Sequence, residues 1–355
     1  MAFNPNSVSR LLIRATNWLG DAVMSLPAIH ALRRALPHAH IAVAARPAIA
    51  DLYARESAVD LVIPYPAPRS FGDRRAFAGR LRAERFDTAL LLQNAFDAAL
   101  IAWLAAIPTR IGYDRDARGI LLTDPIPVPE PGDIPRHERF YYLELLRRAG
   151  IVHHLPADPA IRLDAIPAAR AAGARHLTAL GLAGFVAGVS PGAAYGNAKR
   201  WLPERFAEAA ARLELPVLVF GSPSERPLCE AVALALQRAG RDARNLAGET
   251  TLAEFIELAA ACRVFLTNDS GAMHVASALG VATISVFGPT DDTTTGPTGP
   301  LARVVREQAD CSPCLLRECP IDHRCMTRVT AGRVSLAAAD LISLTSDAWT
   351  PEAKS

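Results

Sequence analysis

The chain has 355 residues, of which 50% are hydrophobic and 21% are charged, and its formal net charge is +2. A chain of this length is longer than a domain with a single hydrophobic core usually is, so two domains are predicted. The apolar content excludes a disordered chain. The small net charge gives no indication of a nucleic-acid-binding protein, so we expect no nucleic-acid partner.

Positive charge is concentrated in the first part of the chain. Residues 1–150 contain 19 Arg against 15 acidic residues (+4), whereas residues 151–355 contain 19 basic against 21 acidic residues (−2). A basic first part suits an anionic acceptor or an anionic membrane surface. Ordinary scatter of surface charge is the alternative explanation.

The sequence contains no segment that we expect to cross a membrane. Residues 1–9 are polar and lack the basic and apolar parts of a signal peptide. The most apolar stretch, residues 89–107, contains Gln93, Asn94 and Asp97, which are costly to bury in lipid. We interpret it as a buried strand followed by a helix. We therefore expect a cytoplasmic protein with reduced cysteines, whose contact with a membrane is peripheral.

Short apolar runs alternate with longer helical patterns, which predicts an α/β architecture with parallel sheets. In the first half, strands are expected at four short apolar runs, residues 10–15, 40–45, 59–64 and 87–92. Helices are expected where apolar residues recur with helical spacing, at residues 21–36, 74–85, 95–106 and 137–149.

Residues 151–166 carry two prolines and no clear period, which is typical of a linker between domains. The alternation then restarts, with strands expected at residues 185–189, 216–220, 263–267 and 283–287. The helices of this half are expected at residues 204–213, 226–239, 252–261 and 272–279. A last helix, residues 331–344, either closes the second domain or crosses back onto the first. The predicted division is two Rossmann-like, doubly wound domains, 1–165 and 166–330, and a C-terminal helix and tail, 331–355.

The loops that follow strands are the places to look for chemistry, because doubly wound sheets bind ligands where their strands end. The first such loop is Asn17-Trp18-Leu19-Gly20-Asp21. Its Gly turn places Asp21 near a helix N-terminus, where the helix dipole favours an ionised carboxylate. Asp21 then either accepts a proton from an incoming hydroxyl or caps the helix. The absence of G-x-G-x-x-G argues against a dinucleotide cofactor.

The second loop, residues 190–201, contains Gly192 and ends in Lys199-Arg200-Trp201. Its small residues let backbone amides approach phosphate oxygens, and Lys199 and Arg200 add positive charge. The chain has two lysines, Lys199 and Lys354, against 36 arginines. A lysine inside this loop therefore indicates a need for a compact point charge, with chance survival of one lysine as the alternative. The absence of G-K-[ST] disfavours ATP hydrolysis.

The third loop, Thr267-Asn268-Asp269-Ser270-Gly271, lies where a strand ends and a helix begins. The amides of Ser270 and Gly271 at that helix N-terminus suit a diphosphate, and the Asp269 carboxylate suits sugar hydroxyls. His274 follows one turn into the helix, either as a ligand-binding residue or as a packed core histidine.

The fourth loop, Gly288-Pro289-Thr290-Asp291, also follows a strand and offers hydroxyl and carboxylate groups to a sugar or a pyrophosphate. Taken alone it is only a turn. Glu225 follows another strand, and it either holds a ribose diol or caps a surface helix.

These four loops together resemble the lipopolysaccharide heptosyltransferase family, glycosyltransferase family 9, and within it the heptosyltransferase II branch. The resemblance extends from about residue 10 to 345 and includes Pro27-Ala28-Ile29 and Met273-His274. It implies a GT-B fold, with two Rossmann-like domains facing a central cleft. It also implies an inverting transfer of L-glycero-D-manno-heptose from ADP-heptose to the first heptose of the lipopolysaccharide inner core, beside the cytoplasmic face of the inner membrane.

The same resemblance assigns roles to individual residues. Asp21 matches the catalytic base, Lys199 the lysine that steadies the leaving diphosphate, and Glu225 the ribose carboxylate. The residues that match the donor-binding set are Gly192, Ala193, Ala194, Tyr195, Lys199, Glu225, Asp269, Ser270, Gly271, His274, Gly288, Pro289 and Thr290. The candidates for binding the lipid A–core acceptor are Asn17, Trp18, Arg69, Arg74 and Arg75. In the heptosyltransferase I branch, hydroxyl residues precede the lysine, whereas Ala194 and Tyr195 stand here, which favours the second branch.

We expect no metal to be required for this chemistry, because Lys199 and helix amides can offset the charge that develops on departing ADP. The run Asp114-Arg115-Asp116 has the spacing of a metal-binding Asp-x-Asp motif but lies in the acceptor half, where we interpret it as a loop. An effect of Mg²⁺ on ADP binding stays open.

Four cysteines, Cys311, Cys314, Cys319 and Cys325, have the spacing C-x2-C-x4-C-x5-C. Such a cluster, with His323 among it, indicates either a structural zinc ion or four reduced thiols in a Pro-rich loop. The remaining two cysteines, residues 229 and 262, are interpreted as core.

Two other functions compete with this interpretation. One is a family-9 glycosyltransferase with another heptose acceptor, of the heptosyltransferase I or III type, or with another nucleotide-sugar. The other is a non-catalytic sensor of nucleotide-sugars on the same scaffold, which is expected to lack the Asp21 carboxylate that is present here.

Overall fold

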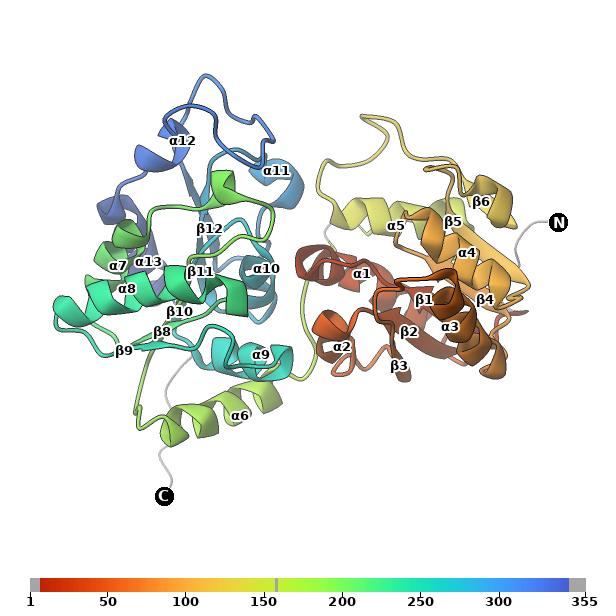
Figure 1. Cartoon of the computed structure of the whole chain (residues 1–355), viewed down its shortest axis with the longest axis horizontal. Helices are drawn as coiled ribbons and strands as arrows, with labels where there is room; N and C mark the ends of the chain where they lie inside the picture. Colours follow the sequence, from red (N-terminus) through yellow and green to blue (C-terminus); the bar gives the residue numbers. More distant parts are fainter. Residues whose placement is uncertain (1–6, 157–158, 345–355) are drawn as a thin grey trace. The chain divides into compact units, whose positions relative to one another are not determined.

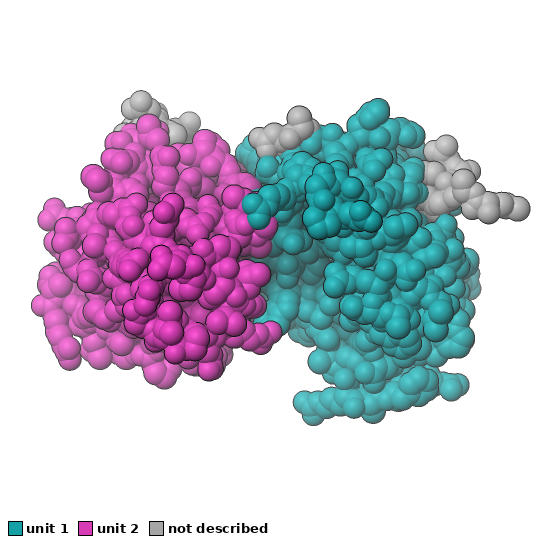
Figure 2. Space-filling model, turned by 90° about the horizontal axis from the view of Figure 1, so that it is seen from above, with its two compact units in different colours: residues 1–164 teal, residues 165–355 magenta. Residues whose placement is uncertain are grey.

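The computed structural model describes residues 7–156 and 159–344. The chain divides into two compact units, Met1–Asp164 and Ala165–Ser355, which Figure 2 shows in different colours. Each unit has its own sheet. The predicted tail, residues 345–355, lies outside the described residues, as do residues 1–6 and 157–158.

The first unit is built on a six-stranded parallel sheet with the order β3-β2-β1-β4-β5-β6 (Figure 1). Its strands are β1 (Arg10–Arg14), β2 (His40–Ala45), β3 (Leu61–Pro64), β4 (Thr88–Leu91), β5 (Thr109–Tyr113) and β6 (Asp124–Ile126). Its α-helices are α1 (Leu19–Ala35), α2 (Pro47–Tyr53), α3 (Phe71–Ala83), α4 (Phe96–Leu104) and α5 (Arg139–Arg148).

Strand β1 lies near the centre of this sheet because its side chains are buried on both faces. Leu11, Leu12 and Ile13 are almost completely buried. Leu12 stands opposite Ala42 of β2 and Ala89 of β4. A continuous apolar run of this kind is typical of a parallel strand that is covered on both faces. The loop after β1 therefore opens at the carboxyl edge of the sheet.

The second unit repeats this arrangement with the order β12-β11-β10-β7-β8-β9, again all parallel. Counted from its own first strand, this is the strand order of the first unit. Its strands are β7 (Ala187–Ser190), β8 (Val217–Val219), β9 (Ala243–Asn245), β10 (Val264–Asn268), β11 (Ala282–Phe287) and β12 (Ala302–Arg306). Its α-helices are α6 (Ile166–Ala179), α7 (Pro203–Ala211), α8 (Arg226–Arg238), α9 (Leu252–Ala261), α10 (Gly271–Ala278), α11 (Asp292–Thr295), α12 (Arg324–Thr327) and α13 (Ala331–Leu344).

Helix α13 belongs to the second unit, which decides between the two positions that the sequence allowed for it. It packs against α7 and β11. Its apolar residues Val334, Ala338 and Leu341 are buried in the core of this unit. That core also contains Cys229, and Cys262 is likewise buried, as expected.

The doubly wound α/β fold predicted for both halves is confirmed, and the predicted strands and helices are found with their ends displaced by at most a few residues. The apolar stretch at residues 89–107 is β4 followed by α4. No helix within residues 7–156 and 159–344 has the length and apolar composition needed to cross a bilayer.

Eight strands and α-helices were missed by the sequence analysis: β5, β6, β9, β12, α2, α6 and the four-residue helices α11 and α12. The four strands are only 3 to 5 residues long and include polar side chains such as Arg110 and Arg244. They lie toward the outer part of each sheet, so they show no continuous apolar run. Helix α2 is short, and α6 is rich in alanine and begins where a linker was expected.

The strand order reverses at one point in each sheet, between β1 and β4 and between β7 and β10. Doubly wound sheets bind ligands at the carboxyl ends of the strands at this point. The loops selected from the sequence follow β1, β7, β10 and β11. The fold therefore places each of them at the ligand-binding edge of its own sheet.

Candidate active site

Asp21 lies in the first turn of α1, at the carboxyl edge of the first sheet. The helix begins after Trp18, whose side chain makes no capping hydrogen bond, and the half-buried Asp21 is the third helical residue. Asp21 is thus not the N-cap. Burial, and next the negative charge of Asp21, raises the pKa of both Glu138 and Tyr142. Asp21 therefore shares this edge with a second carboxyl group and a buried phenol, which the sequence analysis missed.

Asn17 connects two arginines at the same edge. Its Oδ1 accepts hydrogen bonds from Nη2 of Arg14 at 3.0 Å and from Nε of Arg46 at 3.2 Å. Both guanidinium groups lie over the ring of Tyr65, at 4.4 and 4.7 Å from its centre. The Tyr65 hydroxyl donates to Asp97 at 2.5 Å. Two stacked cations thus face one carboxylate, which leaves an excess of positive charge.

Burial, together with a smaller effect of the nearby charge of Arg46, lowers the pKa of Arg14 to about 10. The sequence analysis selected Asn17 but missed Arg14, Arg46 and Tyr65. Arg46 and Tyr65 each directly follow a strand, and Asp97 is the second residue of α4, which follows β4. This is the signal that selected the four loops, but each residue stands alone in its segment.

The predicted acceptor arginines lie on and before α3. Arg74 pairs with Asp97, so it joins the group around Asn17. Arg69 and Arg75 are exposed. Trp18 is 63% exposed, which is unusual for a side chain of its size.

Three of the predicted donor loops meet at one buried carboxylate in the second unit. Nζ of Lys199 lies 2.5 Å from Oδ2 of Asp269, and the Thr290 hydroxyl donates to the same oxygen at 2.6 Å. These residues come from the loops after β7, β10 and β11. Nζ of Lys199 also lies 4.7 Å from the ring centre of Tyr195. The buried members of the predicted donor set near these residues are Gly192, Ala193, Gly288 and Pro289.

Asn268 fixes the loop after β7, residues 190–201 and here called the lysine loop, to the end of β10. Its Nδ2 donates to the Pro191 carbonyl at 2.7 Å, and its Oδ1 accepts from the Trp201 amide at 2.9 Å. Ser270 is the N-cap of α10, but its side chain accepts no hydrogen bond from the amides of the first turn. These amides suit an anion. His274 is buried in the same helix.

Glu225 takes the capping role that the sequence allowed, and it also lies beside the loop after β7. It forms a capping box with Ser222 at a short 3₁₀ turn. Its Oε1 also lies against Gly192, where an added Cβ would come within 2.1 Å of it. Only glycine permits this approach, so the carboxylate lies directly beside the lysine loop. Nη2 of Arg200 lies 4.0 Å from the same oxygen.

The four clustered cysteines lie in one segment, residues 311–325, here called the cysteine loop. Cys311 is exposed, Cys314 and Cys319 are half-buried, and Cys325 is buried. Burial, together with the charges of the other three thiols, raises the pKa of Cys325. The four sulfurs are therefore near one another. Within the described part of the chain, however, no three of them lie within 4.8 Å of each other.

One group of potential metal ligands in the described residues does meet that distance, and it lies in the first unit. Nε2 of His30 is 2.7 Å from the buried Glu56, whose other oxygen accepts from the Asp164 amide at 3.1 Å. The Asp164 carboxylate accepts from the amide and the hydroxyl of Ser57. These groups are already partnered within the protein, and they tie the last residue of the first unit to its core.

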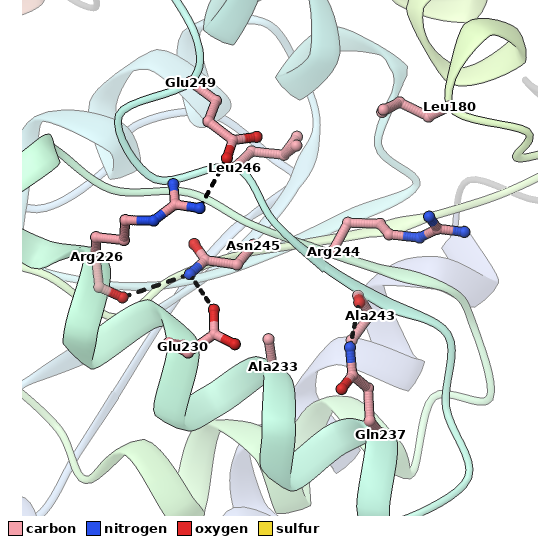
Figure 3. Close-up of a pocket in the computed structure, with 10 residues that line it drawn as sticks. All are labelled: Leu180, Arg226, Glu230, Ala233, Gln237, Ala243, Arg244, Asn245, Leu246 and Glu249. Carbon is pink, nitrogen blue, oxygen red and sulfur yellow. Dashed lines mark hydrogen bonds and ion pairs between the residues drawn. The ribbon is translucent and has the colours of Figure 1, made fainter.

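A pocket of about 360 Å³ lies between α8 and β9 (Figure 3). Its polar side chains bond to one another, with Asn245 donating to Glu230 at 2.6 Å and Arg226 paired with Glu249 at 2.8 Å. None of the residues that line it belongs to the predicted donor set. We assign it no role in the site.

Two doubly wound parallel sheets, with a carboxylate at the edge of one and a cationic, amide-rich cradle at the edge of the other, define a GT-B glycosyltransferase. A model of glycosyltransferase family 9 (heptosyltransferase) matches residues 74–324. The chain belongs to this family, which confirms the family predicted from the four loops.

Named relatives agree with this assignment. The chain is 32% identical over 314 residues to lipopolysaccharide heptosyltransferase 2 of Escherichia coli K12, a match that covers 84% of this chain and 88% of the relative. The structure of E. coli ADP-heptose LPS heptosyltransferase II is similar with a TM-score of 0.80 and 30% identity, covering 95% of this chain and 99% of the other. A family-9 glycosyltransferase from Veillonella parvula has the same fold, with a TM-score of 0.80, 21% identity and coverage of 95% and 97%.

Proposed function

We propose that this protein transfers L-glycero-D-manno-heptose from ADP-heptose to the first heptose of the lipopolysaccharide inner core. The observation that carries the proposal is the meeting of Lys199, Asp269 and Thr290 at one point, in a family-9 chain whose first unit presents Asp21. The test is a screen of the purified protein for release of ADP, UDP or GDP from candidate donors, with an acceptor that ends in heptose I. We expect the protein to release ADP from ADP-heptose, and to release neither UDP nor GDP from the other donors.

The donor is held by its diphosphate at the edge of the second sheet. Lys199 and the uncapped amides of α10 supply positive charge and N–H groups to the phosphate oxygens. Before the donor arrives, Asp269 balances the charge of Lys199. When the diphosphate binds, Lys199 turns toward it, and the Asp269 carboxylate becomes available to sugar hydroxyls. Glu225, beside Gly192, accepts hydrogen bonds from the ribose diol.

The reaction proceeds by a single displacement with inversion. Asp21 accepts the proton of the attacking acceptor hydroxyl, whose oxygen bonds to the anomeric carbon as the bond from that carbon to the diphosphate breaks. The leaving ADP gains negative charge in this step. Lys199 and the helix amides stabilise this charge, so the chemistry requires no metal. Full turnover of enzyme dialysed against a chelator is the expected result, and loss of turnover that Mg²⁺ restores would refute it.

The acceptor is held by its anionic groups at the edge of the first sheet. Arg14 and Arg46 carry charge in excess of the single Asp97 carboxylate, and they lie beside Asn17 in the loop that leads to Asp21. Phosphate or carboxylate groups of a lipid A–core acceptor balance this excess. The exposed Arg69 and Arg75 extend the positive surface along α3.

The membrane contact that we propose is peripheral, at the cytoplasmic face of the inner membrane. Trp18, Phe71 and Phe96 are 63%, 58% and 42% exposed. They begin α1, α3 and α4 or directly precede them, so they lie along one edge of the first sheet. Exposed aromatic rings interspersed with arginines are suited to a lipid headgroup surface. Sedimentation with anionic vesicles tests this contact, and Trp18→Ser with Phe71→Ser is expected to weaken it.

A structural zinc ion at the cysteine loop is a separate proposal. A tetrahedral zinc site has Zn–S distances of about 2.3 Å, which brings its sulfurs within about 4 Å of one another. No three of the four sulfurs lie that close together in the structure, so the cysteine loop must rearrange to bring them around a zinc ion. A metal assay on protein purified without chelator decides the matter, and less than a tenth of an equivalent would end the zinc proposal.

A family-9 transferase with another acceptor or another nucleotide-sugar is the second candidate. Ala194 and Tyr195, in place of hydroxyl residues before Lys199, favour the heptosyltransferase II type. The same nucleotide-release screen separates the two, because a heptosyltransferase I type enzyme would require an acceptor without heptose.

A further inference from the structure

The cysteine loop is bonded directly to the lysine loop. The Tyr195 hydroxyl donates to the Leu315 carbonyl at 2.6 Å. The Ala198 amide donates to the Arg317 carbonyl at 3.0 Å, and the Ala198 carbonyl pairs with Nε2 of His323 at 2.8 Å. The two bonded residues of the lysine loop, Tyr195 and Ala198, lie just before Lys199 in the chain. The two loops are thus held together next to Lys199, although more than 100 residues separate them in the sequence.

The approach of the two backbones is close and depends on one glycine. A Cβ added to Gly196 would lie 2.2 Å from the Arg317 carbonyl oxygen. The cysteine loop also holds the turn that leads to Thr290, because the Leu315 amide donates to the Pro289 carbonyl at 2.9 Å. The cysteine loop is therefore a wall of the donor site, although none of its residues was predicted to bind the donor.

One ring lies within cation–π distance of two cations at this wall. The guanidinium carbon of Arg317 is 5.3 Å from the ring centre of Tyr195, and Nζ of Lys199 is 4.7 Å from it. The ring is held in place because its hydroxyl is bonded to the cysteine loop. That hydroxyl is consequently not available to donate to phosphate oxygens, and the Ala194 side chain has no hydroxyl group.

The charges at this site leave Arg317 in excess. Lys199 is paired with Asp269, and Arg200 lies 4.0 Å from Glu225. Arg317 is exposed, and no carboxylate among the described residues pairs with it. A multiply charged anion requires positive charge beyond what the resident carboxylates already balance. A guanidinium group is also suited to bidentate contact with phosphate oxygens.

We propose that Arg317 is a second diphosphate-binding residue of the donor site, placed beside Lys199 by the Tyr195 ring and the cysteine loop. This inference rests on the proposed function, because the ligand is the diphosphate of the nucleotide-sugar. It assigns the cysteine loop a task in donor binding, and it supplies the contacts that hydroxyl side chains would otherwise make before Lys199.

The test compares the affinities of ADP and AMP for Arg317→Gln, measured by titration calorimetry. The variant is expected to bind ADP about tenfold more weakly than the parent, since a charge-assisted contact is lost, and to bind AMP, which lacks the β-phosphate, with nearly unchanged affinity. Arg317→Lys, which keeps the charge, is expected to recover part of the loss. Arg324→Gln is the matched control, because Arg324 lies nearby and pairs with Asp322, and its ADP affinity is expected to stay at the parent value.

Three outcomes would overturn the inference. Equal weakening of ADP and AMP would mean that the substitution merely loosens the site. Unchanged ADP affinity in Arg317→Gln, with weakened affinity in Lys199→Ala, would reject Arg317 and leave the proposed function standing. Unchanged affinity in both variants would remove the diphosphate site itself, and with it the proposed function.

The ring provides an independent check. Tyr195→Leu removes the surface that both cations share, and Tyr195→Phe removes only the bond to Leu315. We expect Tyr195→Leu to weaken ADP binding more than Tyr195→Phe does, with both variants melting near the parent temperature. Parent affinity for ADP in Tyr195→Leu would refute the shared platform.

Discussion

The carboxyl edges of the two sheets hold charge in opposite ways, although the sheets share one strand order. In the second unit the charges beside the strand ends are paired, Lys199 with Asp269 at 2.5 Å and Arg200 with Glu225 at 4.0 Å, and Arg317 of the cysteine loop adds a charge that no carboxylate of the described residues balances. Such an edge is stable before the donor arrives. Donor binding then exchanges one set of partners for another.

The edge of the first unit places like charges together. Arg46 lowers the pKa of Arg14, and Asp21 raises that of Glu138, in both cases after the larger effect of burial. Like charges that are held together raise the free energy of the protein without ligand. An anion that binds between cations, or a proton that binds to a carboxylate, lowers this free energy again. The comparison supports our proposal that the first unit receives charge that arrives with the acceptor and that the second stabilises charge that develops on the donor.

Replacing Asp21 tests the first unit most severely. Asp21→Asn is expected to reduce turnover by about 10²- to 10⁴-fold, the usual contribution of a general base, because the amide cannot accept the acceptor proton. The affinity for ADP is expected to stay within a few-fold of the parent, since the donor binds to the other unit. Turnover by product release and ADP affinity by calorimetry give the two readings, and retained turnover would remove Asp21 as the base.

Replacing Lys199 tests the paired charges of the second unit. Lys199→Ala is expected to weaken ADP binding by about 10- to 100-fold, because a charge-assisted contact to phosphate is lost. It also leaves Asp269 buried without its cation, so the melting temperature is expected to fall. Arg212→Ala, which breaks an exposed pair with Glu208, is the control for both readings. Parent affinity for ADP in Lys199→Ala would contradict the phosphate role.

The meeting of three loops at the edge of the second sheet could be predicted from the sequence because their residues form contiguous motifs after buried apolar strands. Lys199, Asp269 and Thr290 each follow such a strand, and the carboxyl ends of parallel strands meet at one edge. The sequence did not show that the lysine pairs with the aspartate, since that contact depends on side-chain geometry across β7, β10 and β11.

The group of side chains around Asn17 was only partly predicted, because its other members stand alone in their segments. Arg14, Arg46 and Tyr65 meet only through the pairing of β1, β2 and β3, and no local pattern in the sequence marks them as a group. The cysteine spacing predicted a cluster but not its position. Residues 311–325 have no hydrophobic period, so their contact with the lysine loop depends on packing that appears only in the folded chain.

Replacing Arg46 sharpens the account of the first unit. Arg46→Gln is expected to raise the KM for the acceptor about five- to tenfold, because it removes one of the two stacked cations beside Asn17. The affinity for ADP is expected not to change. Arg80→Gln, an exposed arginine of α3 that lies over Phe77, controls for loss of general surface charge. Equal changes in KM in the two variants would show that only the overall charge matters.

The smallest expected effect concerns Glu138. Its pKa is raised by burial and by Asp21, so the folded state binds the Glu138 proton more tightly than the unfolded state does. This tighter binding stabilises the folded protein fully below about pH 4.3, the pKa of a glutamate in the unfolded chain. The stabilisation is lost as the pH rises through the pKa of Glu138 in the folded protein. At pH 7 the folded protein therefore carries an unfavourable charge that Glu138→Gln removes. We expect this variant to melt about 1–2 °C higher than the parent at pH 7 and at the same temperature near pH 4.

The double variant decides whether Asp21 is the cause. In the Asp21→Asn background the neighbouring charge is absent, so the gain from Glu138→Gln at pH 7 is expected to be smaller, with only the cost of burial left to relieve. An equal gain in both backgrounds would mean that the two carboxylates do not interact. The first edge would then hold no like-charged acidic pair, and its contrast with the second edge would rest on Arg14 and Arg46 alone.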